Sequence, residues 1–136
     1  MRLVLDTNVV VSAFINPAGN PSQILKMVLG RRVELCYNAA ILGEYESVMR
    51  RPKFSGKIDL LKTNQFINLI RVIGISFNPF SSRIKLPDES DRIFYDTAKG
   101  SGSILISGNI RHYPKRPFIM PPANFIKLIG DDKPSL

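Results

Sequence analysis

Short apolar stretches alternate with amphipathic ones along the chain, which is typical of a protein built from strands and helices in turn. Residues 2–5 are mostly apolar and predict a strand that is buried on both faces. Comparable stretches predict further strands at residues 33–37, 75–77, 103–106 and 118–120. Because strands joined through helices lie parallel with right-handed crossovers, we expect an α/β fold, a three-layer α/β/α arrangement around a central, mainly parallel sheet.

Apolar residues at helical spacing fill the segments between these strands. One helix is predicted to begin with Asn20 as its N-cap, with Gln23 completing a capping box. Asn38 is placed to cap the next helix, which Pro52 ends. Further helices are predicted from residue 55 or 59 to 73, from 88 to 99, and after 121.

The length and composition of the chain indicate one globular domain. We place it at residues 1–130 of the 136, with residues 131–136 as a frayed C-terminal tail. The longest apolar runs are too short to cross a bilayer, and no secretory leader precedes the first strand, so we expect a cytoplasmic protein without a membrane partner. Cys36 is the only cysteine, which excludes an internal disulfide and a thiolate zinc cluster.

The charge balance favours a polyanionic partner. The chain carries 19 basic and 11 acidic residues, a net charge of +8. A protein this basic gains affinity for nucleic acid because neutralised phosphates release their counterions. Simple solubility explains the same balance, so the charge alone does not assign a function.

Asp6 comes directly after the first predicted strand. Ligands of open α/β sheets collect at the carboxyl ends of the strands, so a carboxylate at this position points into a crevice. Thr7 and Asn8 can hold it through hydrogen bonds. The segment on its own favours a simpler role, in which Asp6 caps the following helix.

Three later residues are expected at the same edge as Asp6. Asn109 follows the strand at 103–106, and Asp91 lies in the first turn of a helix. Glu44 falls within the apolar stripe of its helix, where a carboxylate is costly unless it is paired or bound to a cation. A basic neighbour of Glu44, or a cap formed by Asp88 and Asp91, explains these residues equally well.

The order of motifs resembles the PIN-domain nucleases, and most closely their toxin-like (VapC-like) branch in toxin–antitoxin pairs. The resemblance spans nearly the whole chain and lies in residues 6–8, 41–45, 51–54, 88–95, 104–109 and 121–125.

By this resemblance, Asp6, Glu44 and Asp91 are the catalytic, metal-binding acids. Asn109 takes a fourth position in which many relatives carry Asp, and this neutral amide weakens a second cation site. We therefore expect one firmly held Mg²⁺ or Mn²⁺, since both prefer oxygen ligands. The resemblance gives supporting roles to Thr7, Asn8, Asp96 and Ser107, although Asp96 lies about 140° around the helix from Asp91.

The expected function is metal-dependent hydrolysis of RNA phosphodiester bonds by an endoribonuclease toxin. The resemblance also implies an antitoxin partner and a homodimer. His112 is interpreted as an ordinary surface residue. The candidates for contact with RNA, each of which is equally explained as a solvated charge, are Arg50, Arg51, Lys53, Arg111, Lys115 and Arg116.

Two alternatives remain open. Because Asn109 removes a charge from the expected site, the chain could be a non-catalytic RNA-binding or interaction module that retains the PIN fold. A phosphoryl-transfer enzyme with an aspartyl nucleophile also begins with a strand-end aspartate, but it needs a second Asp where this chain has Asn8.

Overall fold

A computed structural model describes residues 1–131 of the chain. Its five strands form one sheet in the order β3-β2-β1-β4-β5, and every pairing is parallel. β1 is central because its residues Leu3, Val4 and Leu5 are almost completely buried and tolerate neighbours on both edges. The strands are β1 (Arg2–Leu5), β2 (Glu34–Tyr37), β3 (Ile75–Ser76), β4 (Ile104–Ile106) and β5 (Ile119–Met120).

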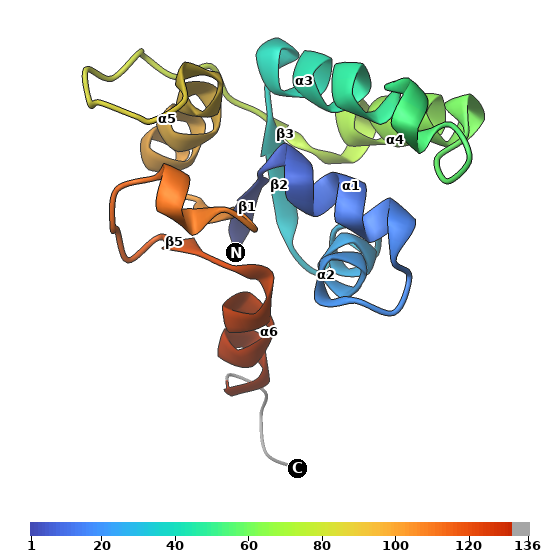
Figure 1. The fold of residues 1–136 in the computed structure, drawn as a ribbon. Coiled ribbons are helices and arrows are strands. Elements are labelled where there is room, and N and C mark those ends of the chain that lie inside the picture. Colours follow the sequence, from blue (N-terminus) through green and yellow to red (C-terminus); the bar gives the residue numbers. More distant parts are fainter. Residues whose placement is uncertain (132–136) are drawn as a thin grey trace.

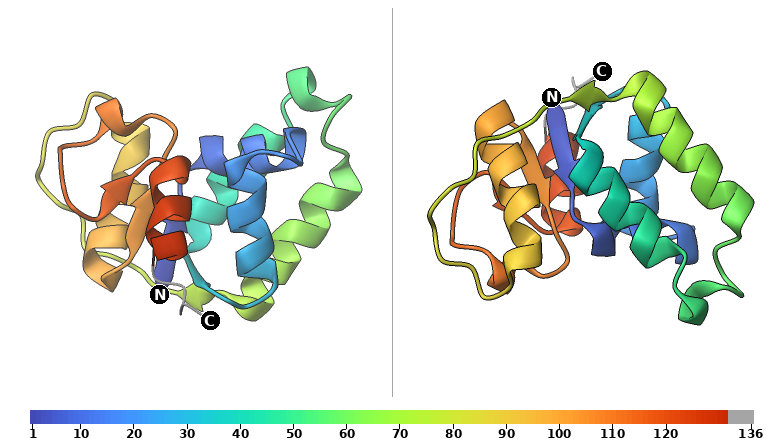
Figure 2. Two further views of the ribbon diagram at one scale, coloured as in Figure 1. Left: turned by 90° about the horizontal axis from the view of Figure 1, so that it is seen from below. Right: turned by 90° about the horizontal axis from the view of Figure 1, so that it is seen from above.

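Helices cover both faces of this sheet (Figure 1). α5 lies against β1, β2 and β4 on one face, while α2 and α6 pack together on the other (Figure 2). α3 contacts α1, α4 and α5. The predicted three-layer α/β/α architecture is therefore confirmed. The helices are α1 (Thr7–Ile15), α2 (Asn20–Leu29), α3 (Ala39–Met49), α4 (Leu60–Ile73), α5 (Arg92–Ser101) and α6 (Pro122–Asp131).

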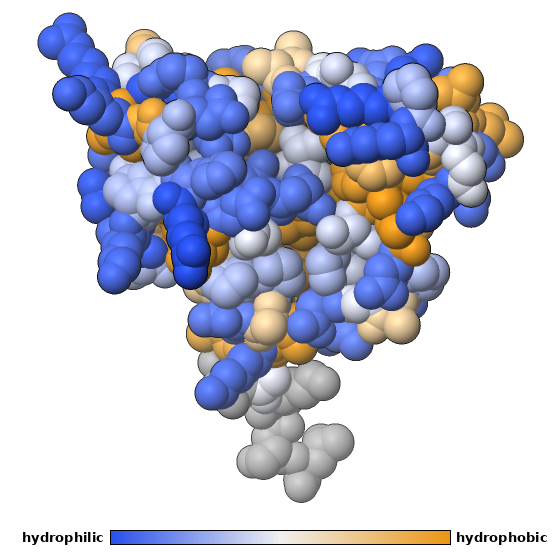
Figure 3. Space-filling model, viewed as in Figure 1, coloured by the Kyte–Doolittle hydropathy of each residue, from blue (hydrophilic) through white to orange (hydrophobic). Residues whose placement is uncertain are grey.

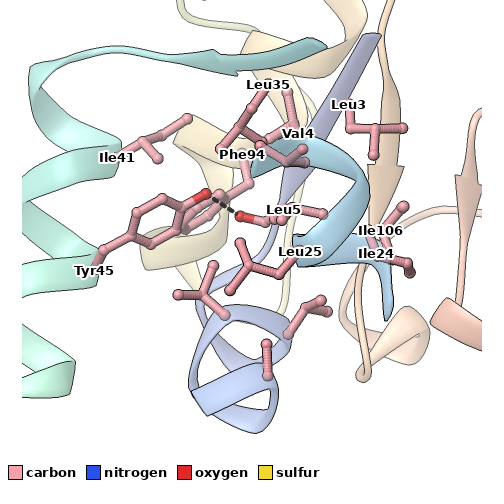
Figure 4. Close-up of a cluster of buried hydrophobic side chains, with 14 of the residues drawn as sticks. Leu3, Val4, Leu5, Ile24, Leu25, Leu35, Ile41, Tyr45, Phe94 and Ile106 are labelled. Carbon is pink, nitrogen blue, oxygen red and sulfur yellow. Dashed lines mark hydrogen bonds between the residues drawn. The ribbon is translucent and has the colours of Figure 1, made fainter. Parts of the chain in front are cut away.

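The core surrounds β1 and joins the layers (Figure 4). Tyr45 of α3 is fully buried and donates its hydroxyl to the Leu5 carbonyl at the end of β1. Phe94 of α5 stacks against the Tyr45 ring, with centroids 6.2 Å apart. These contacts bring α3 and α5 to the carboxyl end of β1, where Asp6 follows.

The predicted cap of α2 is wrong. Gly19, rather than Asn20, occupies the N-cap position, and no side chain caps this helix. The turn before it is already closed by Asn16, whose side-chain oxygen accepts the Ala18 amide hydrogen bond. The backbone N–H of Gly19 donates to the Asn16 carbonyl at 3.2 Å, so it is already satisfied and the Gln23 side chain forms no capping box with it.

The sequence also led to expectations about the C-terminal tail and about membrane-spanning segments. Residues 132–136, most of the predicted C-terminal tail, lie outside the described residues, whereas Asp131 still belongs to α6. Within the described part of the chain, every helix is too short or too polar to span a membrane.

Candidate functional site

The carboxyl ends of β1 and β4 bring two distant segments together. Leu5 pairs with Ile106 in the parallel register, and the Asp6 amide donates to the Ile106 carbonyl at 2.9 Å. Asp6 and Ser107 are thus the first residues beyond two adjacent strands. As expected for parallel strands, they lie at the same edge of the sheet.

Asp6 is held at this edge by three hydrogen-bond donors. Its Oδ1 accepts from the Thr7 amide at 2.8 Å, so the residue does cap α1. Its Oδ2 accepts from the hydroxyls of Ser107 and Tyr113, each at 2.8 Å. Asp6 is only 5% exposed, and these three donors satisfy a carboxylate whose burial would otherwise be costly.

Asp91 lies where a short 3₁₀ turn, Glu89–Asp91, leads into α5. Burial raises the pKa of Asp91, and the negative charges of Asp6 and Asp88 raise it further. The side chain of His112, with Nδ1 at 3.2 Å from Oδ2 of Asp91, opposes this effect. His112 contacts Asp91 and the next residue, Tyr113, contacts Asp6, so the structure brings these two predicted acids near one another.

The sequence did not predict the part that Tyr113 takes in this site. Tyr113 is 6% exposed, and burial together with the charges of Asp6 and Asp91 raises the pKa of its phenol well above the usual range. The interpretation of His112 as ordinary surface is wrong in one respect, because its ring nitrogen faces Asp91 although its side chain is about half exposed. The signal in the sequence that could have revealed both roles is the pair His112–Tyr113, which follows closely after the segment at the end of β4.

Glu44 is half-buried on α3, in agreement with its place in the apolar stripe. The adjacent Tyr45 ties this part of α3 to the end of β1, so Glu44 belongs to the helix that borders the site. Within residues 1–131, its carboxylate has no hydrogen-bond or ion-pair partner, and no three His, Cys, Asp or Glu side chains form a group able to hold a metal ion. Convergence of Glu44 with Asp6 and Asp91 stays a prediction.

The segment after β4 is fastened to the start of α1. The Gly108 amide donates to the side-chain oxygen of Asn8 at 2.9 Å, and the Asn109 amide donates to Ser107 Oγ at 3.0 Å. Asn109 itself is exposed. Thr7 Oγ1 is buried and has no hydrogen-bond partner among residues 1–131. Of the predicted supporting residues, Thr7 and Ser107 therefore contact Asp6 directly, and Asn8 joins the two segments that carry it.

Asp96 serves a different part of the structure. It is 5% exposed and accepts a hydrogen bond from the Ser82 amide at 3.0 Å. Arg92, one turn earlier, donates to the carbonyls of Ser82 and Ile84. The two side chains fasten the segment before Asp88 onto α5, so Asp96 braces the approach to Asp91 rather than contacting it.

The basic candidates fall into two groups. Arg111, Lys115 and Arg116 are exposed in the segment that carries His112 and Tyr113. The second group follows α3, where Arg50 pairs with Glu46 at 3.0 Å, and Arg51 and Lys53 are exposed. Much of the face seen in Figure 3 is hydrophilic, with hydrophobic residues at the surface over α1.

The fold and the site together define an α/β protein with paired aspartates at the carboxyl edge of a parallel sheet. A family model described as PIN domain matches residues 2–111, which is most of the chain. The chain therefore belongs to the PIN-domain family, as its motifs indicated.

Two known proteins are similar to the chain. An uncharacterized protein of Methanocaldococcus jannaschii, MJ1680, is 28% identical over 112 residues, which cover 80% of this chain and 71% of that protein. A solved chain of VapBC2 from Rickettsia felis, bound to a DNA fragment from their promoter, superposes with a TM-score of 0.55. It covers 89% of this chain and 97% of its own length at 14% identity, so it supports the fold alone.

Proposed function

We propose that the chain is a divalent-metal-dependent endoribonuclease and the toxin of a toxin–antitoxin pair. The observation that carries this proposal is that two consecutive residues contact both acids: His112 Nδ1 lies 3.2 Å from Asp91 Oδ2, and the Tyr113 hydroxyl lies 2.8 Å from Asp6 Oδ2. Membership of the PIN-domain family supports nucleic acid as the substrate class.

The residues present fit a hard divalent cation. Burial and the charge of Asp6 both disfavour the charged form of Asp91, and a bound cation relieves both penalties. Asp6 and Asp91 would hold Mg²⁺ or Mn²⁺, with Glu44 and Asn109 as the nearest further oxygen donors by prediction. When bound, such an ion would acidify the attacking water and offset charge on the phosphate.

The two aspartates are suited to different tasks. Asp6 is oriented by three hydrogen-bond donors, which suits it to serve as a ligand. Asp91 is half-buried and lies 3.2 Å from the His112 ring, so we assign it the proton of the attacking water. The exposed cations Arg111, Lys115 and Arg116 follow the site in the chain and would bind the RNA backbone.

The partners follow from the same proposal. The similar solved chain belongs to VapBC2 of Rickettsia felis, bound to a DNA fragment from their promoter. By analogy with this complex, we assign the chain an antitoxin protein as its inhibitor. The homodimer and the cytoplasmic location stay predictions from the sequence. Copurification with the product of a neighbouring small reading frame is the direct check on the antitoxin.

The activity is tested by incubating the protein with mixed single-stranded RNA and Mn²⁺. Asp6→Asn should lower the cleavage rate by more than about 100-fold, beyond the usual cost of losing an outer-shell partner of a metal site. Glu34→Gln is the matched control, because Glu34 is an exposed acid at the opposite end of β2, paired with Arg2 at 3.6 Å. Cleavage without metal, or equal cleavage by wild type and Asp6→Asn, would contradict the assignment.

A second candidate function is an RNA-binding module without turnover. Two observations favour it: the neutral Asn109 in place of an acid, and the lack of a ready-made group of three metal ligands among residues 1–131. The same experiment separates the two functions. RNA binding without cleavage in Mn²⁺ would support the module.

A further inference from the structure

One short turn reaches both aspartates of the site. His112 ends the 3₁₀ turn Ile110–His112, and Tyr113 follows it. His112 Nδ1 lies 3.2 Å from Asp91 Oδ2, and the Tyr113 hydroxyl lies 2.8 Å from Asp6 Oδ2. Consecutive side chains thus contact two acids that come from different elements, the end of β1 and the start of α5.

The hydrogen bonds to Asp6 leave one oxygen for a ligand. A carboxylate oxygen has two lone pairs in its plane, and those of Oδ2 are used by Ser107 and Tyr113. Within residues 1–131, Oδ1 accepts only the Thr7 amide and keeps a lone pair free. Tyr113 therefore restricts Asp6 to binding a cation through Oδ1 alone.

The two hydroxyl donors to Asp6 Oδ2 are not interchangeable. The Tyr113 side chain is only 6% exposed, and its hydroxyl donates to Asp6 at 2.8 Å. Ser107 cannot easily substitute for it, because Ser107 Oγ already accepts the Asn109 amide while donating to Asp6.

We infer that Tyr113 is a positioning residue that fixes the carboxylate of Asp6 for a single divalent cation. This inference rests on the proposed function, because it concerns the same cation. The orientation of Asp6 matters for affinity, because Oδ1 is the oxygen left to bind the cation and the partners that orient a metal ligand affect how tightly the metal is held.

The test measures Mn²⁺ binding to the full chain in the absence of RNA. Binding is monitored in electron paramagnetic resonance as the loss of the signal of free Mn²⁺. Tyr113→Phe keeps the ring and removes only the donor, and it should weaken Mn²⁺ binding by about 10–100-fold. Tyr95→Phe is the matched control. The Tyr95 hydroxyl is buried in α5 and has no hydrogen-bond partner in the described part of the chain, so its removal should leave Mn²⁺ affinity unchanged.

A double-mutant cycle separates positioning from a general structural role. In an Asp6→Asn background, Tyr113→Phe should have no further effect on Mn²⁺ binding, and both single variants should keep the far-UV circular dichroism of the wild type. Equal or tighter Mn²⁺ binding by Tyr113→Phe would overturn the inference while leaving the metal site in place. If the wild type does not bind Mn²⁺, or binds it no more tightly than Asp6→Asn does, both the inference and the proposed function are overturned.

Discussion

Asp91 is a residue whose charge works against the folded state. Burial and the charges of Asp6 and Asp88 raise its pKa from the ordinary value of 3.8. Between this value and the raised pKa, the folded protein binds more protons than the unfolded chain, so the unfolding free energy falls as pH rises. Above the raised pKa the full cost is present. Acids placed this way are typical of functional sites.

Replacing Asp91 should therefore stabilise the metal-free protein. We expect Asp91→Asn to raise the free energy of unfolding at pH 7 by about 1 kcal/mol, the usual size of a charge-relieving substitution. The gain should disappear as pH is lowered below the ordinary pKa of 3.8, because the wild-type residue is then neutral in both states. Urea denaturation over a pH series measures this difference.

Asp88 provides the control of opposite sign. Its side chain accepts the Ser90 amide at 2.9 Å, and this hydrogen bond lowers its pKa. Its contribution to stability is present above the ordinary pKa of 3.8 and is lost as pH falls through the lowered value. Asp88→Asn should not stabilise the protein at pH 7. A less stable Asp91→Asn variant at pH 7 would show that the charge cost at this site is absent.

At the scale of elements, two glycines in helices have opposite effects on stability, one at a helix end and one in a helix interior. Gly102 ends α5 with φ of +68°, the left-handed conformation that a residue with a Cβ adopts at a cost. Gly43 is in the opposite situation, since it lies in the middle of α3 and a Cβ there would meet no atom within 4 Å. The same residue type is thus favourable at one position and unfavourable at the other.

The two glycines should respond in opposite directions to alanine. Gly102→Ala should lower the free energy of unfolding by about 1–2 kcal/mol, the cost of a left-handed residue. Gly43→Ala should raise it by about 0.5–1 kcal/mol through helix propensity. Thermal or urea unfolding of the two variants checks both values, and equal shifts of the same sign would refute this account.

At the scale of the whole molecule, the net charge of +8 is spread over separate surfaces. Arg111, Lys115 and Arg116 lie in the segment next to the paired aspartates, while Lys26 and Arg32 line a cavity of about 360 Å³ between α2 and α6. Only the first group follows the candidate site in the chain. The long-range attraction of RNA depends on all of these charges. Direct contact with a phosphate of RNA bound at the site is made only by basic side chains that lie close to the site.

RNA binding should reveal which of these charges contact phosphate. Neutralising Arg111, Lys115 and Arg116 to alanine should weaken binding of a single-stranded RNA and reduce the slope of log affinity against log salt by about 2. The matched control removes the same charge from Lys26, Arg31 and Arg32, which are exposed at the end of α2. Equal loss of slope in the two triple variants would refute a local RNA surface beside Asp6 and Asp91.

The strands, the helices and the edge that carries Asp6 could all be predicted from the sequence. Each depends on contacts between residues close in the chain or on the rule that parallel strands end at one edge. The cap of α2 could not be predicted, because both Gly19 and Asn20 suit an N-cap and the preceding turn decides between them. The position of Glu44 relative to the two aspartates stays a prediction for a similar reason, since periodicity gives a helix face but not a distance.

The sequence by itself determined the order of elements, the parallel sheet and the family, because periodicity and motif order are properties of neighbouring residues. Only the tertiary structure decided that Tyr113 donates to Asp6 and that His112 faces Asp91, across separations of 107 and 21 residues. The raised pKa of Asp91 was decided there too. Such effects depend on burial and on charges from other elements, and these exist only once the chain has folded.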